Sequence, residues 1–533
     1  MLGKTRLVAL LSFVASALCV QHTVAQVPVG TECTEKRIRK PWEAYSAAEK
    51  TRYINAVSQA MKKGYHQKFV ELHTDAASEL EAHRTCMFIY WHRMFLLGYE
   101  NMLRSLAPEF QCVTLPYWDH LSATARLASR TCTSLEGCSP IFKDFGGSTI
   151  GKDINLNIYG AIIRDTTSTK CITQSMLSSF CGNNTQCAGC VLRGPASQTR
   201  YPAEAYFGSV YQQMFTYSDW VNFASSIERG VHNTVHSAIG GVMAYFQSPI
   251  DPLFYTHHGL VDLLQTVYLK CQLNSDSQLL TPQQKGSDPR FWSNCARRSS
   301  GTFLPTDAIT MNTRDYGGAW VNVRTNPNNI LYPFFKDIPA KFSDLVDAKD
   351  LGPYSYTYQL QGALTNMYTN CKASNTIKAA ALMADEELES RNKEDFEGLR
   401  PIIKGPSAED SKMRLWTIAV YESAKLAGYT DSAARDQMEL MLCYHADECL
   451  GGVFDYDPIF RENFGVTGHP RCYTLLEQLK AGKRVIGVPE WHDISSKFLK
   501  CPQPKKDADG KTHHHKADEE TTTEGESDAT ATS

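Results

Sequence analysis

Histidines with metal-binding spacing occur near the middle of the chain. His232 and His236 are four residues apart, so on a helix of about 100° per residue both imidazoles project from one face. Two imidazoles on one face make half of a metal site. An Asp-Pro turn at 251–252 follows, and a second helical run then carries His257 and His258. The pair followed by this second run predicts a metal site more strongly than the pair alone.

Another group of histidines lies earlier in the chain and contains His66, His73, His83 and His92. His83 and His92 are nine residues apart, and about 900° of rotation would leave them on opposite faces of one continuous helix. If both bind the same ion, His83 must lie in a loop before the helix or at its very start. We predict a break there.

The residue types in the two groups favour copper. Carboxylates are absent from the candidate ligand positions, which argues against a di-iron carboxylate bundle. Asn233 follows His232, where zinc proteases carry a glutamate as general base. All-imidazole triplets suit copper, although zinc accepts them too. The alternative, that aromatic-rich helices use these histidines only as core residues, does not account for two complementary triplets.

The elements that carry these residues read mostly as helices. Apolar residues recur with helical spacing from Trp42 to Met61, and Gly64 ends that run. Two more helical runs follow up to residue 105. The segment 121–205 separates the two groups of histidines and carries six cysteines, and the segment 272–330 is dominated by loops.

The N-terminus has the pattern of a secretory signal peptide over residues 1–25. Lys4 and Arg6 precede an apolar run over 7–20 and a small-residue cleavage site that ends at Ala25. No later apolar stretch reaches the length of a membrane span. We therefore expect a secreted, extracellular protein that does not span a membrane.

Cysteine content agrees with an oxidising compartment. The chain has 17 cysteines, and Cys19 falls within the signal, which leaves an even number for up to eight disulfides. The formal net charge is −3, which gives no reason to expect nucleic acid or an anionic membrane as a partner. Oligomeric state and disulfide pairing cannot be inferred from these patterns.

Four sequence runs surround the candidate ligands: AHRTCMFIYWHRMFLLGYENML, VTLPYWDH, VHNTVHSAIGGVM and DPLFYTHHGLVD. These runs resemble the paired copper signatures of the tyrosinase family of type 3 dicopper proteins, which includes tyrosinases, catechol oxidases and molluscan-type haemocyanins. The resemblance extends from about Cys33 to the stretch Tyr354-Ser355-Tyr356. It implies a mainly α fold, with a central antiparallel four-helix bundle and long loops that hold a dicopper site.

The resemblance also implies two sets of copper ligands. They are His73, His83 and His92 for one copper, and His232, His236 and His258 for the other. His66 competes for the first position, and the family's phenylalanine-x-x-x-histidine spacing, seen as Phe69 to His73, favours His73. His257 is expected beside the ligands rather than among them.

Several positions depart from the family pattern. Tyr90 stands in place of the usual proline, and His120 in place of a tryptophan; we interpret both as packing changes. Many relatives carry a cysteine, crosslinked to a ligand, where this chain has Glu81, so that crosslink is expected to be absent. Cys86 is expected to be half of a disulfide or a buried thiol.

The family's chemistry implies roles for two further residues. Two copper ions can pass two electrons to O2, and an o-diphenol that supplies electrons leaves as an o-quinone. A monophenol must first lose its proton, for which a positioned base is needed. Glu228 and Asn233 resemble the family's pair proposed to act in this deprotonation. The alternative is that Glu228 is a solvated carboxylate at a helix start.

Neighbouring residues are expected to support the ligands. Phe254, four residues before His258, is expected to pack against the imidazoles. Arg93 and Asp262 each lie near a ligand and could form a buried ion pair between two helices. The pair of glycines at 240–241 predicts a tight turn and open space above the coppers.

The chain divides into a signal peptide (1–25), a dicopper domain (26–358), a smaller, mainly helical, disulfide-bearing C-terminal domain (359–501) and a disordered polar tail (502–533). In several relatives a C-terminal extension covers the copper site, and here an aromatic near Phe454 or Tyr456 could do so. The alternative is a domain that only supports folding or secretion.

Two other features lie in loops. Cys187-Ala188-Gly189-Cys190 could suggest zinc, but a disulfide-stapled loop is expected in a secreted chain. Asn183-Asn184-Thr185 is a glycosylation sequon. In the tail, a run of histidines at 513–515 is expected to be solvated rather than to bind copper.

The sequence thus predicts a copper-dependent phenol oxidase that hydroxylates monophenols and oxidises o-diphenols with O2. Its substrate is expected to be a small phenol or o-diphenol, or protein tyrosines. The alternatives are a catechol oxidase without hydroxylase activity, a haemocyanin-like oxygen carrier, and a structural protein with a vestigial site. The chain lacks the tandem arrays of oxygen carriers, and its complete histidine set argues against a vestigial site.

Overall fold

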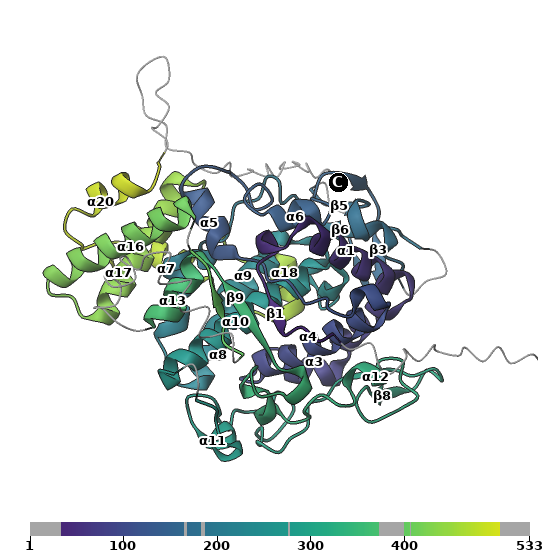
Figure 1. The fold of residues 1–533 in the computed structure, drawn as a ribbon. Helices are drawn as coiled ribbons and strands as arrows, with labels where there is room; N and C mark the ends of the chain where they lie inside the picture. Colours follow the sequence, from purple (N-terminus) through teal and green to yellow (C-terminus); the bar gives the residue numbers. More distant parts are fainter. Residues whose placement is uncertain are drawn as a thin grey trace, which may run out of the picture.

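A computed structural model of the chain describes residues 33–164, 168–182, 187–275, 278–371, 399–405 and 407–501 (Figure 1). These residues are mainly helical, as predicted. The predicted signal peptide (1–25), the sequon at 183–185 and the tail (502–533) lie outside the described residues. Within the described ranges, no helix combines the length and the apolar composition that a bilayer crossing requires.

Helices up to residue 371 form the region that carries the candidate ligands. They are α1 (Ala47–Lys62), α2 (Tyr65–Thr74), α3 (Ala76–Ala82), α4 (Phe88–Ser105), α5 (His120–Ala128), α6 (Pro140–Asp144), α7 (Phe207–Phe215), α8 (Trp220–Ile227), the π-helical turn η5 (Glu228–His232), α9 (Asn233–Ile239), α10 (Leu253–Leu273), α11 (Pro282–Ser287), α12 (Tyr332–Phe335) and α13 (Gly362–Asn370). The C-terminal segment adds α16 (Ala408–Leu426), α17 (Asp431–Cys449), α18 (Pro458–Phe464), α19 (Arg471–Lys480) and α20 (Trp491–Phe498).

Among the described residues, the strands are short and form four small sheets. One sheet has the order β1–β9–β10, in which β9 (Tyr356–Leu360) pairs in parallel with β1 (Arg37–Arg39) and β10 (Ile402–Ile403). The others are β2 (Gly151–Lys152) with β5 (Lys170–Ile172) and β6 (Val191–Arg193), β3 (Leu156–Ile158) with β4 (Ala161–Ile163), and β7 (Asn312–Arg314) with β8 (Trp320–Asn322). The expected domain boundary at 358/359 falls within β9, and the division into two domains stays a prediction.

Local signals explain where the helices near the site begin and end. Ser46 and Glu49 form a capping box at the start of α1, and Gly64 follows its end with φ +78°. The predicted break before α4 is present, because α3 ends at Ala82 and α4 begins at Phe88. His83 has extended backbone angles (φ −130°, ψ 150°) and therefore lies in the loop between the two helices.

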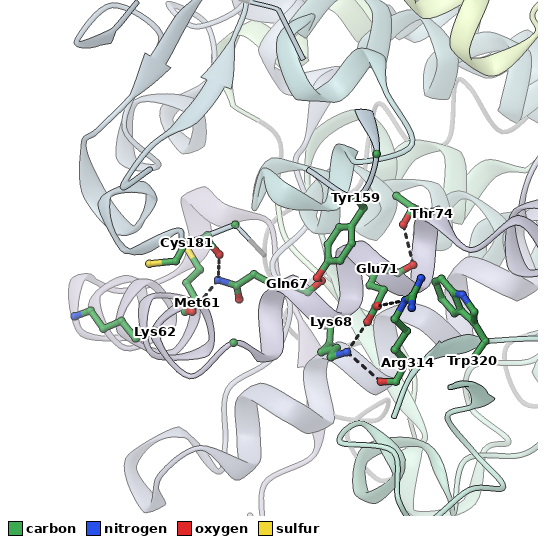
Figure 2. A pocket seen from close by; sticks show the side chains of 13 residues that line it. Met61, Lys62, Gln67, Lys68, Glu71, Thr74, Tyr159, Cys181, Arg314 and Trp320 are labelled. Carbon is green, nitrogen blue, oxygen red and sulfur yellow. Dashed lines mark hydrogen bonds and ion pairs between the residues drawn. The ribbon is translucent and has the colours of Figure 1, made fainter. Parts of the chain in front are cut away.

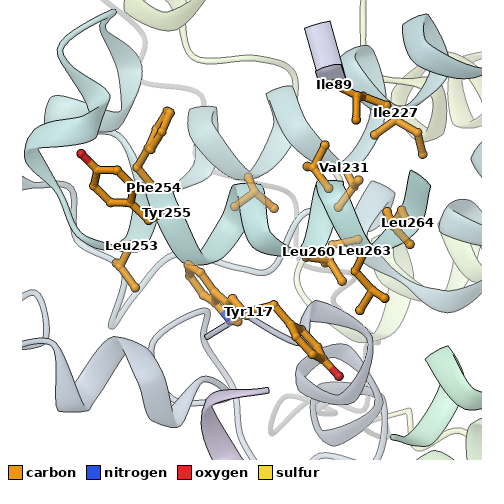
Figure 3. Packing of buried hydrophobic residues seen from close by; sticks show 14 of the residues in the cluster. Ile89, Tyr117, Ile227, Val231, Leu253, Phe254, Tyr255, Leu260, Leu263 and Leu264 are labelled. Atoms are coloured by element: carbon orange, nitrogen blue, oxygen red, sulfur yellow. The ribbon is translucent and has the colours of Figure 1, made fainter. Parts of the chain in front are cut away.

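The centre of the core is α10, which is buried along nearly its whole length (Figure 3). Leu253, Leu260, Leu263 and Leu264 are all fully buried, and they pack among aromatic and aliphatic side chains from other elements. A helix that is buried on every face needs neighbours all round. This burial fixes α10 in place and, with it, His258.

Disulfides link all sixteen cysteines outside the predicted signal. The pairs are Cys33–Cys112, Cys86–Cys295, Cys132–Cys138, Cys171–Cys190, Cys181–Cys187, Cys271–Cys371, Cys443–Cys472 and Cys449–Cys501. Cys86 is thus a disulfide half. The expected disulfide loop at 187–190 is confirmed, with each of its cysteines paired to a different upstream cysteine.

Candidate metal centre

Three imidazoles from α2, α4 and the loop between α3 and α4 meet in the core. One nitrogen each of His73, His83 and His92 lie within 4.8 Å of one another, and all three side chains are buried. The ring centroids of His73 and His83 are 4.9 Å apart, and those of His83 and His92 are 5.1 Å apart. The loop position of His83 is what turns its ring towards His92.

A second set of imidazoles comes from η5, α9 and α10. The Nε2 atom of His258 lies 3.3 Å from Nε2 of His232 and 3.4 Å from Nε2 of His236. All three side chains are buried. The rings of His92 and His258 stack at 4.2 Å, so the two sets lie side by side.

Hydrogen bonding shows which ring nitrogens are free to bind a metal. Nδ1 of His73 lies 2.6 Å from the carbonyl oxygen of Phe246, and Nδ1 of His92 lies 2.8 Å from that of Phe88. A carbonyl only accepts, so each Nδ1 carries the hydrogen and each Nε2 carries a lone pair. Those two Nε2 atoms face each other at 3.4 Å. Two facing lone pairs repel unless a cation lies between them, so this set fits a bound metal ion.

In the second set, too, oxygen atoms bond to Nδ1 of two imidazoles and leave Nε2 free. Nδ1 of His236 donates to the carbonyl oxygen of Met243 at 2.9 Å, and Nδ1 of His232 lies 2.9 Å from Oδ1 of Asn233. Both Nε2 atoms therefore present lone pairs towards His258. Neutral imidazole nitrogens without carboxylates form a donor set that copper accepts.

Burial keeps these imidazoles in the neutral form that binds metals. It lowers the pKa of His73 to about 3 and that of His236 to about 4. The pKa values of the other four fall well below the ordinary range of histidine, because of burial and of the neighbouring imidazoles: His83, His92, His232 and His258. No proton therefore competes with a metal ion near neutral pH.

Two other histidines near the site have hydrogen-bond partners in the protein. His66 bonds to the hydroxyl of Tyr99 at 2.8 Å and to the carbonyl oxygen of Ile250 at 3.0 Å, and it is not part of the first triplet. His257 lies within reach of the second triplet, but both of its ring nitrogens have hydrogen-bond partners in the protein. These partners favour His73 and His258 as the third members of the two sets.

Aromatic and charged residues hold the two sets in place. The ring of Phe254 lies 5.1 Å from His73 and 4.1 Å from His258, as expected. Nε of Arg93 donates to Asp262 at 2.6 Å, so the expected buried ion pair joins α4 to α10. Asp262 also accepts from Tyr356, which belongs to the tyrosine-rich strand β9.

Glu228 is buried in η5 rather than solvated. Its Oε1 accepts the backbone N–H of Arg84 at 2.6 Å, which ties η5 to the loop that carries His83. Burial raises the pKa of Glu228 to about 7, although the bond from Arg84 acts in the opposite direction. A carboxyl group with this pKa can both accept and release a proton near neutral pH.

Sequence comparisons agree with the geometry of the site. A family model described as the common central domain of tyrosinase matches residues 62–270. The chain is 32% identical over 248 residues to a tyrosinase from Streptomyces glaucescens, across 43% of this chain and 80% of that protein. The chain belongs to the tyrosinase family.

Other similarities involve more distant proteins. This tyrosinase-family chain is 27% identical to a tyrosinase-like protein from Diaporthe leptostromiformis, across 48% of this chain and 68% of that protein. A mutant polyphenol oxidase from Thermothelomyces thermophila is 20% identical and gives a TM-score of 0.37, across 61% of this chain and 88% of that one. Family membership makes the chain a type 3 copper oxidoreductase of the tyrosinase or polyphenol oxidase type, which acts on phenols.

One element that contacts the site comes from the C-terminal segment. Figure 1 shows α18, in yellow-green, among the purple and teal helices and away from α16, α17 and α20. The ring of Phe464 lies 5.6 Å from His83, 5.9 Å from His236 and 4.6 Å from Phe246. Of the two expected positions, Phe454 is 57% exposed, whereas Tyr456 is buried in the same cluster as Phe464. Tyr456 donates to the backbone oxygen of Arg229 at 2.5 Å.

Sequence reasoning missed Phe464, although a local signal was present. Asp457-Pro458 is a helix start and Gly465 a helix end, so Phe460 and Phe464 fall four residues apart on one face. The tight turn predicted at the two glycines 240–241 is present, but the space around them differs from the expectation. Gly240 and Gly241 both have positive φ, and a Cβ at Gly241 would meet the oxygen of Leu192 at 2.3 Å. The expected open space at these glycines is therefore filled by backbone.

A surface groove of about 810 Å³ lies away from the six imidazoles, between α2 and the hairpins β3–β4 and β7–β8 (Figure 2). Its charged groups bind one another. Nζ of Lys68 donates to Glu71 at 2.6 Å and to the backbone oxygen of Arg314 at 3.0 Å, and Arg314 lies 3.8 Å from Glu71. None of the candidate ligands lines this groove, so the candidate chemistry stays with the histidines.

Proposed function

We propose that the chain is a tyrosinase in the strict sense, which hydroxylates monophenols at the ortho position and oxidises o-diphenols to o-quinones with O2. The observation that carries this proposal is the convergence of buried, neutral imidazoles whose lone pairs face one another. His73, His83 and His92 would hold one copper ion, and His232, His236 and His258 the other. Bound copper supplies the two-electron chemistry with O2.

Glu228 and Asn233 are the proposed catalytic residues of the hydroxylation. A phenol has a pKa of about 10, like the tyrosine side chain, so a base must take its proton near neutral pH. One oxygen of Glu228 is occupied by the N–H of Arg84, which leaves the other to accept the phenol proton. Asn233 fixes the ring of His232 through its side-chain oxygen. A purely structural Glu228 would favour a catechol oxidase instead.

The deciding experiment uses the copper-loaded protein with tyrosine and, separately, with an o-diphenol, while quinone formation and O2 uptake are followed. Activity on both substrates is the expected result. Activity on the diphenol alone would identify a catechol oxidase, and reversible O2 binding without turnover an oxygen carrier. Because α18 lies at the site, the assay is repeated after limited proteolysis, so that a covered site is not mistaken for an inactive one.

We further propose that the C-terminal segment covers the site in the intact chain. Three hydrogen bonds hold α18 at its rim: Asp457 N–H to Ser237 Oγ at 2.7 Å, Asn463 Nδ2 to the oxygen of Ala244 at 2.9 Å, and the bond from Tyr456 to Arg229. Cleavage after about residue 360 should raise the activity. An unchanged rate after complete cleavage would count against a cover.

Secretion is also part of the proposal. Eight disulfides support an oxidising compartment, which is where the predicted signal peptide would direct the chain. Expression of the full chain in a secreting cell tests this directly. The mature protein in the medium should begin near residue 26, whereas intact residues 1–25 would contradict cleavage.

A further inference from the structure

His257 stands beside His258 in α10 and is a competitor for the second metal position. One nitrogen each of His232, His236 and His257 lie within 4.8 Å of one another. The ring centroid of His257 is 5.6 Å from that of His232 and 5.2 Å from that of His236. On distance alone, His257 could take the place of His258.

A chain of hydrogen bonds decides which nitrogen of His257 carries its hydrogen. Nε2 of His257 lies 3.2 Å from the carbonyl oxygen of His232, so it must donate, and the lone pair is on Nδ1. Nε2 of His120 lies 2.9 Å from that Nδ1 and must donate to it. The remaining nitrogen of His120 then accepts the hydroxyl hydrogen of Tyr201 at 2.6 Å.

These hydrogen bonds occupy the only lone pair on the ring of His257. His120 and His257 are fully buried and Tyr201 is 3% exposed, so water does not compete for these bonds. For His258, in contrast, Nδ1 finds no hydrogen-bond partner among the described residues, and Nε2 faces His232 and His236. The two adjacent histidines therefore differ in whether a ring-nitrogen lone pair is free to bind a metal, rather than in their distance from His232 and His236.

We propose that Tyr201 and His120 are positioning residues that keep His257 out of the ligand set and so leave the second copper to His258. The inference rests on the proposed function, which names His258 as a ligand. It also gives a purpose to His120, which stands where the family resemblance leads us to expect tryptophan. An indole has one donor and no acceptor, so it could not accept the hydroxyl of Tyr201.

A role in packing alone is the competing explanation, because the ring of His120 lies 4.5 Å from that of Trp118. Packing affects stability but does not select the histidine that binds copper. The readout is therefore copper bound per chain after equilibrium dialysis, together with the electron paramagnetic resonance spectrum of the cupric protein.

The test compares variants that differ only at these histidines. His258→Ala is expected to keep one copper per chain. His120→Phe with His258→Ala frees the lone pair of His257 and should regain the second copper, and adding His257→Ala should remove it again. In the single variant His120→Phe, which keeps His258, two coppers per chain are expected.

Tyr201→Phe is the milder variant, since it removes one oxygen and keeps the ring. Combined with His258→Ala it should regain part of the second copper, and it decides the question if the His120 variants do not fold. Copper content that stays at one per chain in both combinations, with unchanged circular dichroism, overturns the inference. Two coppers in His258→Ala itself, or fewer than two in the parent protein, would instead refute the ligand assignment of the proposed function, and the inference with it.

Discussion

Single hydrogen atoms decide how the candidate ligands can act. Four of the six imidazoles have an Nδ1–H fixed by an oxygen, supplied by Phe246, Phe88, Asn233 and Met243. The bond to Met243 spans seven residues, and positive φ at both Gly240 and Gly241 brings that carbonyl back towards His236. The two glycines are thus needed for the orientation of a candidate ligand.

Glu228→Gln tests the proposed base. The amide keeps an oxygen for the N–H of Arg84 but cannot take a proton. We expect hydroxylation of monophenols to fall by about 100- to 10,000-fold, the usual contribution of a general base, while o-diphenol oxidation changes far less. Because the pKa of Glu228 is raised to about 7, monophenol turnover in the parent should increase as pH rises through about 7. The variant should lose this dependence.

Glu204 offers a matched control for that variant. It is also buried, also accepts a backbone N–H, from Cys472 at 2.9 Å, and burial also raises its pKa to about 7. Glu204→Gln should leave the ratio of the two activities unchanged. If both activities fall equally in Glu228→Gln, the carboxyl group acts by holding the His83 loop, and its assignment as a base is wrong.

Local geometry explains which site residues could be predicted from the sequence. The loop position of His83 follows from its angular separation from His92, and the pairing of Arg93 with Asp262 follows from their places beside ligands. The partner of His120 does not follow from such arguments, since residue 257 is far away in the chain and its approach depends on the whole core. Disulfide pairing could not be predicted for the same reason.

At the scale of helices, α18 is the element proposed to cover the site. Phe464→Ala removes the ring that packs against His83 and His236. Burial of a phenylalanine side chain contributes about 1.5–3 kcal/mol, so the population with α18 displaced should rise by roughly 10- to 100-fold. We expect a higher rate on phenols without proteolysis, measured as initial quinone formation.

Phe454 provides the control, because it belongs to the same segment and is 57% exposed. Phe454→Ala should leave the initial rate as it is in the parent chain. Equal rates in the parent and in Phe464→Ala, with both proteins carrying the same copper, would mean that α18 does not limit access.

The two sets of histidines also connect helices, so metal removal should loosen the elements together. Without copper, the lone pairs of His73 and His92 face each other at 3.4 Å and repel. A ligand that binds only the folded state adds about 4 kcal/mol at a thousand times its dissociation constant. We expect the melting temperature to rise on copper loading, with slower hydrogen exchange in α4 and α9. His258→Ala should show a smaller rise; an equal rise would contradict its role as a ligand.

Helices themselves were the most predictable part of the fold. The run from Trp42 to Met61 and its end at Gly64 correspond to α1, which carries its own capping signals. The π-helical turn η5 was not predictable from periodicity. It arises where Gly230 leaves helical angles (ψ −117°) and Gln213 accepts the N–H of Val231 at 2.9 Å, which is a tertiary contact.

In the whole molecule, the C-terminal segment meets the central region through buried carboxyl groups. The hydroxyl of Ser122 in α5 lies 2.8 Å from Asp119 and 3.2 Å from Asp410 in α16, yet it has one hydrogen to donate. Asp119 also accepts the N–H of Ser122 at 3.0 Å and that of Nε2 of Gln361 at 3.3 Å, while Glu43 adds another negative charge nearby. Burial and the nearby charge of Asp410 both favour the protonated form of Asp119.

This arrangement makes contact between the two regions depend on pH. Burial and the charge of Asp410 raise the pKa of Asp119 to about 7. When docking raises the pKa of a carboxyl group, the group stabilises the docked state fully at pH values below its free pKa of about 3.9. This stabilisation decreases as the pH rises and is lost once the pH passes the raised pKa of about 7. Docking of α16 should therefore weaken by about tenfold per pH unit over that interval. Hydrogen exchange of α16 amides between pH 5 and pH 8 measures this pH dependence of docking.

Asp119→Asn keeps the hydrogen-bonding shape of the side chain but cannot ionise, so its docking should vary much less with pH. Asp153→Asn, at an exposed aspartate, is the control and should behave like the parent. Because α16 and α18 belong to one segment, the same rise in pH should also increase phenol oxidation in the intact chain more than in the proteolysed one. A pH profile of α16 exchange that is identical in the parent and in Asp119→Asn would show that another group is responsible.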